Sequence, residues 1–237
     1  MCAPRPPQGA APPLPRSAER ELLASGCATL GLEPSADEIE RLLALIDALE
    51  SANARFNLTA IRDRPAMLRK HLLDSLTLQP FLAGDSLADV GTGAGFPGLP
   101  LAILNPARRC VLIESTGKKA RFVEATARAL ECGNVEVVAQ RAELYRPAAP
   151  FARVCARALA SLAQFAACAL HLCAPQGRLL AMKGRRPDAE IAALPPNVRL
   201  VAVHRVQVPG LDDERHIVEL SPSGRSGAWH RSREARP

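Results

Sequence analysis

Aromatic residues are scarce in this 237-residue chain, which contains six Phe, one Tyr and one Trp. Proteins that bind unpaired nucleic acid through base stacking use several aromatic side chains, so this chain cannot depend on stacking alone. Any recognition of nucleic acid would instead use its shape and its phosphates. The few aromatic candidates for contact with a base are Phe56, Phe96, Tyr145 and Trp229.

Paired cysteines and long apolar runs are also absent. The seven cysteines include no C-x-x-C pair, so we expect neither a metal site nor a disulfide framework. No run of about 18 apolar residues could span a bilayer, and no signal-peptide core follows the N-terminus. We therefore expect a soluble cytoplasmic protein in a reducing compartment, with no membrane partner.

Positive charge is concentrated at the two ends of the chain. The formal net charge is +6, but five of these six charges fall in residues 1–17 and 222–237, so overall basicity is weak evidence for a nucleic-acid partner. The composition divides the chain into a disordered Pro/Ala-rich extension over 1–17, a helical region over 18–84, a main domain over 85–221 and a disordered basic tail over 222–237.

The helical region contains a clear helix start. Ser35 and Glu38 have the spacing of a capping box, and the apolar stripe that follows predicts a helix used for packing: Ile39, Leu42, Leu43, Ile46 and Leu49. Further along, a basic group either contacts phosphates or forms a solvated face, and the sequence leaves both open: Arg62, Arg64, Arg69 and Lys70.

From residue 86 onward, expected strands and helices alternate, which predicts a mostly parallel sheet. The expected strands are 86–90, 110–114, 135–139, 153–157, 178–183, 198–208 and 216–220. The expected helices are 99–104, 118–131 and 159–172. A short connection, Pro-Gly-Leu-Asp-Asp, joins the last two strands and suits an antiparallel pair.

A glycine-rich loop follows the first of these strands. Residues 89–98 read Asp-Val-Gly-Thr-Gly-Ala-Gly-Phe-Pro-Gly, a strand end and a helix start separated by glycines that let a ligand approach the backbone. Gly93 to Gly98 fits the G-x-G-x-x-G pattern of NAD-binding oxidoreductases. Asp89, Gly91, Gly93 and Gly95 fit the acidic-x-Gly-x-Gly-x-Gly loop of S-adenosylmethionine enzymes. The Asp89 carboxylate would lie close to a positive cofactor and repel a pyrophosphate, which favours the second interpretation.

Further candidates follow the next strands. Glu114 ends a strand 19 residues after Gly95, where a carboxylate can bind the ribose of a bound nucleoside. In an open parallel sheet the ligand lies at the carboxyl ends of the strands. The residues expected around this mouth are Gln140, Arg141, Ala142, Glu143, Arg157, Lys183, Gly184, Arg185 and Arg186.

Several motifs resemble the bacterial ribosomal small-subunit RNA methyltransferase G family. They are Phe-Asn-Leu-Thr-Ala-Ile-Arg-Asp (56–63), Arg-Lys-His-Leu-Leu-Asp-Ser (69–75), the glycine loop (89–103), Glu-Ser-Thr-Gly-Lys-Lys (114–119), Ala-Arg-Ala-Leu-Ala (156–160), Met-Lys-Gly (182–184) and Glu-Arg-His-Ile-Val (214–218). The resemblance covers about residues 40–220. Glu114 departs from it, since many relatives have Asp there, but the carboxylate is kept.

The resemblance implies a Rossmann-like, class I S-adenosylmethionine methyltransferase fold: an α/β protein whose seven-stranded, mostly parallel sheet has an antiparallel last strand and follows a helical N-terminal region. It implies methylation of N7 of one guanine in 16S rRNA, with the rRNA or the small ribosomal subunit as partner. It also implies cofactor contacts at Gly91, Phe96, Ala142, Glu143 and Arg157.

Guanine N7 has a free lone pair, so this reaction needs no general base and we name no catalytic residue. His71 is the one tempting exception, and a helix residue satisfied by packing is its more usual role. Two basic groups are expected to hold RNA phosphates: Lys118, Lys119 and Arg121, and Lys183, Arg185 and Arg186. No heptad pattern predicts a dimer, so we expect a monomer.

Three rival functions remain open at this point. A small-molecule methyltransferase would share the fold, an NAD-dependent oxidoreductase would use the same glycines, and a non-catalytic RNA-binding protein would lack methyl transfer.

Overall fold

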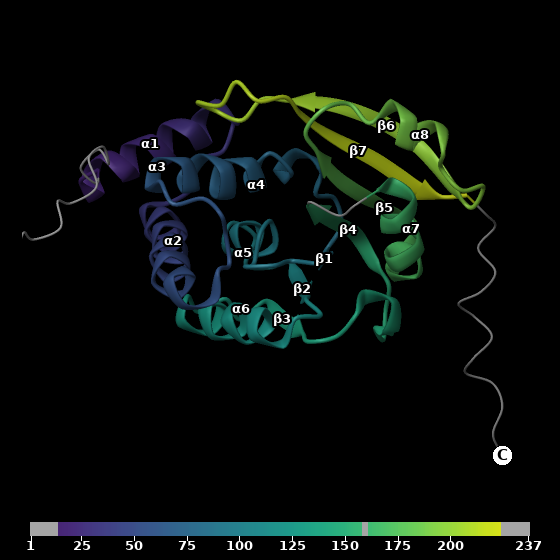
Figure 1. The fold of residues 1–237 in the computed structure, drawn as a ribbon, viewed down its shortest axis with the longest axis horizontal. Coiled ribbons are helices and arrows are strands. Elements are labelled where there is room, and N and C mark those ends of the chain that lie inside the picture. Colours follow the sequence, from purple (N-terminus) through teal and green to yellow (C-terminus); the bar gives the residue numbers. More distant parts are fainter. Residues whose placement is uncertain (1–13, 158–160, 224–237) are drawn as a thin grey trace, which may run out of the picture.

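A computed structural model describes residues 14–157 and 161–223. Its centre is a seven-stranded sheet of β1 (Ser86–Val90), β2 (Arg109–Ile113), β3 (Val135–Val138), β4 (Phe151–Arg157), β5 (Cys173–Lys183), β6 (Val198–Val206) and β7 (Arg215–Pro222). The strand order is β3-β2-β1-β4-β5-β7-β6, and β7 runs antiparallel to both of its neighbours, β5 and β6 (Figure 1). The predicted sheet, with its antiparallel last strand, is therefore confirmed.

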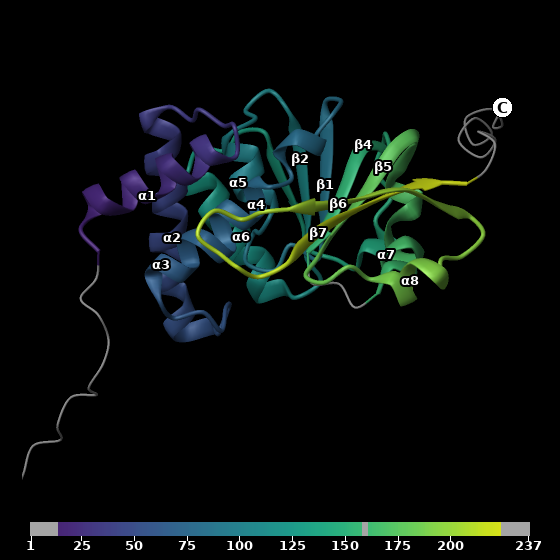
Figure 2. The same ribbon diagram turned by 90° about the horizontal axis from the view of Figure 1, so that it is seen from above.

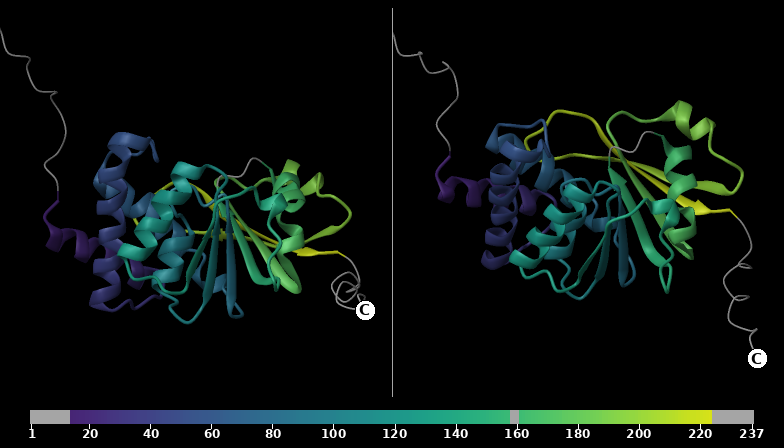
Figure 3. Two further views of the ribbon diagram at one scale, coloured as in Figure 1. Left: turned by 90° about the horizontal axis from the view of Figure 1, so that it is seen from below. Right: turned by 60° about the horizontal axis from the view of Figure 1, so that its bottom comes forward.

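The helices are α1 (Arg16–Thr29), α2 (Ala36–Phe56), α3 (Arg64–Met67), α4 (Asp74–Leu76), α5 (Gly98–Ile103), α6 (Gly117–Ala129), α7 (Leu162–Ala169) and α8 (Asp188–Ala192). A π-helical turn over Leu68–Leu73 joins α3 to α4. Helices α2, α5 and α6 cover one side of the sheet, and α7 and α8 lie on the other (Figures 2 and 3). No helix in these described ranges is long and apolar enough to cross a membrane.

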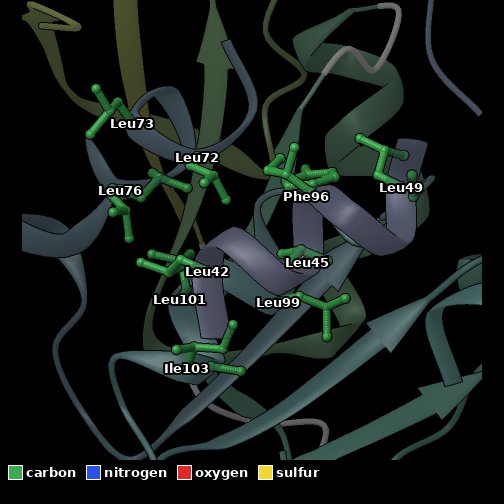
Figure 4. Close-up of a cluster of buried hydrophobic side chains, with 14 of the residues drawn as sticks. Leu42, Leu45, Leu49, Leu72, Leu73, Leu76, Phe96, Leu99, Leu101 and Ile103 are labelled. Atoms are coloured by element: carbon green, nitrogen blue, oxygen red, sulfur yellow. The ribbon is translucent and has the colours of Figure 1, made fainter. Parts of the chain in front are cut away.

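Alternation along the strands divides the apolar side chains between two cores, because successive side chains of a strand point to opposite faces. Leu87 belongs to the cluster beneath α2 and α5, whereas Ala88 and Val90 belong to the cluster beneath α7. In the first cluster, leucines of α2 meet residues of the 68–76 stretch and of α5 (Figure 4). The helical N-terminal region is thus packed directly against the helix that follows the glycine loop.

The start of α2 agrees with its sequence signal. The Ser35 hydroxyl accepts a hydrogen bond from the Glu38 amide, and the Glu38 carboxylate accepts one from the Ser35 amide at 2.7 Å. All five residues of the predicted stripe are at most 6% exposed. The capping box and the packing role of this helix are confirmed.

The predicted terminal extensions lie mostly in residues 1–13 and 224–237, outside the described residues. Within the described part, α1 begins at Arg16 and β7 continues to Pro222, each just inside a predicted extension.

Candidate functional site

The carboxyl ends of β1, β2 and β3 form one edge of the sheet, and the glycine loop lies there between β1 and α5. Gly91 and Gly93 have positive φ angles of 68° and 62°, which L side chains rarely adopt. A Cβ at Gly91 would meet no atom within 4 Å, so the backbone here faces open space. The loop therefore offers a surface that a ligand can approach closely.

Asp89 lies at the end of β1 and is completely buried. Its Oδ2 accepts hydrogen bonds from Thr92 Oγ1 at 2.6 Å and from the Gly98 amide at 2.8 Å, so it ties the two ends of the loop together. Its Oδ1 has no hydrogen-bond partner among the residues that the structure describes. Burial raises the pKa of this carboxyl to about 6, although both hydrogen bonds oppose the shift. The expected contact between Asp89 and a cofactor stays a prediction.

Glu114, just after β2, connects the first two loops of the sheet edge. Its Oε2 accepts a hydrogen bond from the Gly93 amide at 2.9 Å, and its Oε1 accepts one from the Thr116 amide at 2.7 Å. The side chain is almost buried, at 6% exposure. Glu114 thus fixes the middle of the glycine loop, and its expected contact with a ribose stays a prediction.

A cavity of about 150 Å³ opens beside this loop. It is lined from β1 by Val90 and Gly91, from the β2 end by Ile113 and Ser115, from the β3 end by Gln140, Arg141, Ala142 and Glu143, and from α7 by Cys168. Three expected cofactor residues, Gly91, Ala142 and Glu143, therefore meet at one cavity. Binding sites for drug-sized molecules measure about 300–1,000 Å³, so this cavity suits one end of a nucleoside cofactor.

Phe96 and Arg157 do not line this cavity but meet in a second cluster. The Arg157 guanidinium lies 5.5 Å from the centre of the Phe96 ring, and the His71 ring stacks on Phe96 at 4.8 Å. Arg157 Nη1 also donates to the Lys70 carbonyl at 2.9 Å, within the π-helical turn. π-Helical turns occur frequently at functional sites. This cluster joins the N-terminal helices to the glycine loop.

His71 has a defined protonation state in this cluster. Its Nδ1 lies 3.4 Å from Arg157 Nη2, which can only donate, so the Nε2 atom carries the proton and donates to Thr59 Oγ1 at 3.0 Å. Burial, and then the charge of Arg157, lower the pKa of His71 to about 4. The ring is therefore neutral, buried and hydrogen-bonded, as expected for a packing residue.

Asp74 and Arg215 were not identified as site residues from the sequence. Asp74 is 5% exposed, and its two oxygens bind Arg157 at 3.3 Å and Arg215 at 2.9 Å. One buried carboxylate thereby joins the residue after the π-helical turn to the end of β4 and the start of β7. Both residues lie in motifs on which the family resemblance rests, and these motifs could have identified them as site residues.

The two expected phosphate-binding groups differ in how accessible they are. Lys118 and Arg121 are exposed at the start of α6, and Lys119 is half-buried beside them. Arg185 is exposed after β5, and Arg186 is exposed but paired with Asp188 at 2.7 Å. Lys183 is half-buried, and its ammonium lies 2.9 Å from the Glu190 carboxylate. Phosphate binding by these residues stays a prediction, and Lys183 would first have to leave Glu190.

The basic group of the helical region consists of Arg62, Arg64, Arg69 and Lys70, and Arg64 in it forms ion pairs within the protein. It binds the carboxylates of Glu19, Asp47 and Glu50 and so joins α1, α2 and α3. Arg69 packs against the turn at Gly210, and Lys70 lies 3.4 Å from Asp213. Of the four residues, Arg62 is exposed, and the Lys70 side chain is 40% exposed beside Asp213.

A larger depression, of about 670 Å³, lies along the second half of α6, the turn after it and β3. Its lining contains none of the loop residues that follow the carboxyl ends of the strands. We therefore place the candidate site at the smaller cavity, where glycine loop and strand ends meet.

The sheet order, the glycine loop after β1 and the carboxylate after β2 define the fold of class I S-adenosylmethionine methyltransferases. Solved structures with this fold include TrmN from Thermus thermophilus, with a TM-score of 0.52 and 23% identity, covering 72% of this chain and 53% of TrmN. The glycopeptide N-methyltransferase MtfA, complexed with S-adenosylmethionine, has a TM-score of 0.52 and 10% identity, covering 65% of this chain and 88% of MtfA.

Sequence comparison defines the family within this class. The model of the GidB family, rRNA small subunit methyltransferase G, matches residues 38–218. The ribosomal RNA small subunit methyltransferase G of Nitrosococcus oceani is 44% identical over 201 residues, 85% of this chain and 94% of that protein. The Xanthomonas campestris protein of the same name is 48% identical over 196 residues, 83% and 92% of the two chains. The chain belongs to the rRNA small subunit methyltransferase G family.

Proposed function

We propose that this protein transfers a methyl group from S-adenosylmethionine to N7 of one guanine in 16S rRNA of the small ribosomal subunit. The observation that supports this most directly is the family match, together with a cavity at the carboxyl ends of β1 to β3 that contains Gly91, Ala142 and Glu143. The alignments cover more than nine tenths of the relatives' length, and both relatives are named as rRNA methyltransferases.

The residues present fit this cofactor. Gly91 presents open backbone, Ala142 leaves space beside it, and the Glu143 carboxylate at the cavity can accept a hydrogen bond from the adenine amino group. Phe96 is 3% exposed, with His71 stacked on its ring and Arg157 over it, so it would act here by fixing the loop that faces the cofactor. When bound, S-adenosylmethionine supplies an electrophilic methyl group on a sulfonium.

Positioning is the main contribution expected from the protein. Guanine N7 carries a lone pair and no proton, so no side chain has to remove one. His71 is neutral, with its Nδ1 lone pair directed at Arg157, and is therefore not free to act as a base. Holding two reactants in line can contribute up to about 7–11 kcal/mol to the rate enhancement.

RNA binding is assigned to the charged edges of this mouth. Lys118, Lys119 and Arg121 on one side, and Arg185 and Arg186 on the other, would contact phosphates, and Lys183 would join them only after release from Glu190. The predicted monomer is part of this proposal, and sedimentation of the purified protein tests it.

Two measurements test the proposal. Calorimetric titration compares S-adenosylmethionine, its demethylated product S-adenosylhomocysteine, and NAD, and we expect heat of binding from the first two only. Mass spectrometry of rRNA from a strain lacking this protein should then show the loss of one N7-methylguanine, restored by the purified enzyme. Binding of NAD alone, or an unchanged set of rRNA methylations, contradicts the proposal.

A further inference from the structure

The turn after α2 exposes an aromatic ring. Among the described residues, three large hydrophobic side chains are exposed, Phe56, Leu144 and Val201, and Phe56 is the aromatic one, at 41% exposure. It is the last residue of α2 and begins the Phe-Asn-Leu-Thr motif. A single exposed apolar side chain is ordinary at a protein surface, so exposure alone does not make this ring a contact surface. The turn that carries it and the charged residues near it in the chain make it a candidate.

The turn that carries Phe56 is held in one conformation. Asn57 closes α2 with a positive φ of 48°. The buried Asn53 donates from Nδ2 to the Thr59 carbonyl at 3.0 Å and accepts on Oδ1 from the Thr59 amide at 2.9 Å. These two hydrogen bonds hold both backbone polar groups of Thr59 against the last turn of α2. Because the backbone that carries the ring is held, binding a flat partner there would cost little backbone freedom.

The same turn is linked to the methyl-transfer site. Thr59 Oγ1 accepts a hydrogen bond from His71, whose ring stacks on Phe96 of the glycine loop. The segment after α2 also lies at the end of the molecule where the carboxyl ends of the strands lie (Figures 2 and 3). Phe56 therefore has a fixed relation to the position where the target guanine would be methylated.

The charge around the ring identifies the partner. Arg55 precedes Phe56 directly in the chain and is exposed, and the exposed Arg62 is brought back to the turn, where its Nη2 donates to Asn57 Oδ1 at 3.4 Å. The nearby Asp63 carboxylate is used to cap α3, where it accepts from the Ala66 amide at 2.8 Å. An exposed aromatic ring on a turn that also carries two exposed arginines suits an unpaired nucleotide, since the ring can stack on the base and the arginines can contact phosphates.

We propose that the Phe56 turn, residues 55–62, binds an unpaired nucleotide of the RNA next to the guanine that is methylated. Phe56 stacks on its base, and Arg55 and Arg62 contact its phosphates. This inference rests on the proposed function, and it adds a contact outside the cofactor cavity and outside both basic groups at the strand ends.

Substitution of Phe56 tests the stacking contact. The full-length protein carries Phe56→Ala, Phe56→Leu or Phe56→Trp, and binding is measured to small ribosomal subunits and to deproteinised 16S rRNA from a strain lacking the enzyme. We expect RNA affinity to fall about 5- to 100-fold in Phe56→Ala and partly in Phe56→Leu, and to be retained in Phe56→Trp. Affinity for S-adenosylmethionine should stay unchanged in all three. The matched control is Val201→Ala on β6, which should leave RNA affinity unchanged.

Substitution of Arg62 tests the phosphate contact. Arg62→Ala should lower the slope of log affinity against log salt by about 0.7 to 0.9, whereas Arg128→Ala, an exposed arginine at the far end of α6, should leave it unchanged. Equal RNA affinity of Phe56→Ala and wild type, or equal loss in Phe56→Ala and Phe56→Trp, overturns the inference. If wild type methylates rRNA and binds S-adenosylmethionine normally, that outcome leaves the proposed function intact.

Discussion

At the scale of single residues, the buried Asp89 carries an unusual electrostatic cost. The fold raises its pKa from 3.8 to about 6, because burial disfavours the charged form more than Thr92 and Gly98 stabilise it. A carboxyl whose pKa is raised by folding binds protons more tightly in the folded than in the unfolded chain. Its contribution to stability is therefore present below pH 4 and is lost as the pH rises through about 6.

Asp89→Asn should remove this pH dependence while keeping a side-chain oxygen that can accept from the Gly98 amide. We expect the free energy of unfolding of wild type, relative to Asp89→Asn, to decrease by roughly 2–4 kcal/mol between pH 4 and pH 7, since one pKa unit corresponds to about 1.4 kcal/mol. Urea denaturation at several pH values measures the difference. A constant difference across this range would show that Asp89 is not the group that titrates.

Glu114 makes a second residue-scale prediction, on cofactor affinity. Both of its oxygens accept hydrogen bonds from backbone amides, and Gln offers only one such oxygen and places an NH₂ group against an N–H donor. Hydrogen bonds to a charged group contribute about 1.5–3 kcal/mol, so Glu114→Gln should weaken S-adenosylmethionine binding about 10- to 100-fold. Calorimetry measures it. The control Glu124→Gln, on the exposed face of α6, should bind as wild type does.

At the scale of elements, Arg64 holds three helices together through carboxylates of α1 and α2. Glu19 is 2% exposed, so removal of Arg64 leaves a buried charge with only the longer contact to Arg16, at 3.5 Å, among the described residues. We expect Arg64→Ala to lower the free energy of unfolding by about 2–4 kcal/mol. This loss is smaller than that expected for a fully buried ion pair, because Asp47 and Glu50 are partly exposed. Denaturation with urea measures the loss.

The matched control is Arg20→Ala, whose partner Glu40 is also on α2 but whose own side chain is exposed. Exposed ion pairs contribute little, so this variant should unfold with wild-type stability. A second substitution, Glu19→Leu, should restore part of the stability lost in Arg64→Ala, because it removes the stranded charge. Equal stability of the two arginine variants would contradict the structural role of Arg64.

The sequence predicts the bounds of a helix or strand correctly where residues next to the boundary determine it. β1 runs over 86–90 as predicted, since its apolar run ends at the glycines, and the Ser35 capping box placed the start of α2. β5 was predicted to begin at Arg178 but begins at Cys173. Pro175 and Gly177 argue against a strand locally, and pairing of Cys173 with Phe151 of β4 outweighs them.

The candidate site likewise contains features that the sequence predicts and features that it does not. Gly91, Ala142 and Glu143 could be placed together, because residues that follow neighbouring parallel strands meet at one edge of the sheet. The partners of individual side chains could not. Lys183 pairs with Glu190, and Arg157 with Asp74, through contacts between elements that no spacing in the sequence encodes. The π-helical turn at His71 likewise has no local sequence signal.

At the scale of the whole molecule, the described body and the chain ends contribute differently to charge. Five of the six net positive charges lie in residues 1–17 and 222–237, so the rest of the chain is close to neutral. On the proposed function, attraction between the enzyme and RNA at a distance would be set mainly by the ends. Affinity at close contact would depend on the proposed phosphate contacts, such as Arg62 and Lys118.

Replacing Arg225, Arg231, Arg233 and Arg236 with Ser therefore changes long-range attraction without touching the described site. It lowers the formal net charge from +6 to +2. We expect RNA affinity to fall at 50 mM salt, the difference from wild type to shrink by 200 mM, and the slope of log affinity against log salt to decrease by up to about 3. A chain with the same tail residues in scrambled order should behave as wild type, because charge rather than sequence acts here. The rate at saturating RNA should be unchanged in both, and a loss of that rate would place the tail within the active site instead.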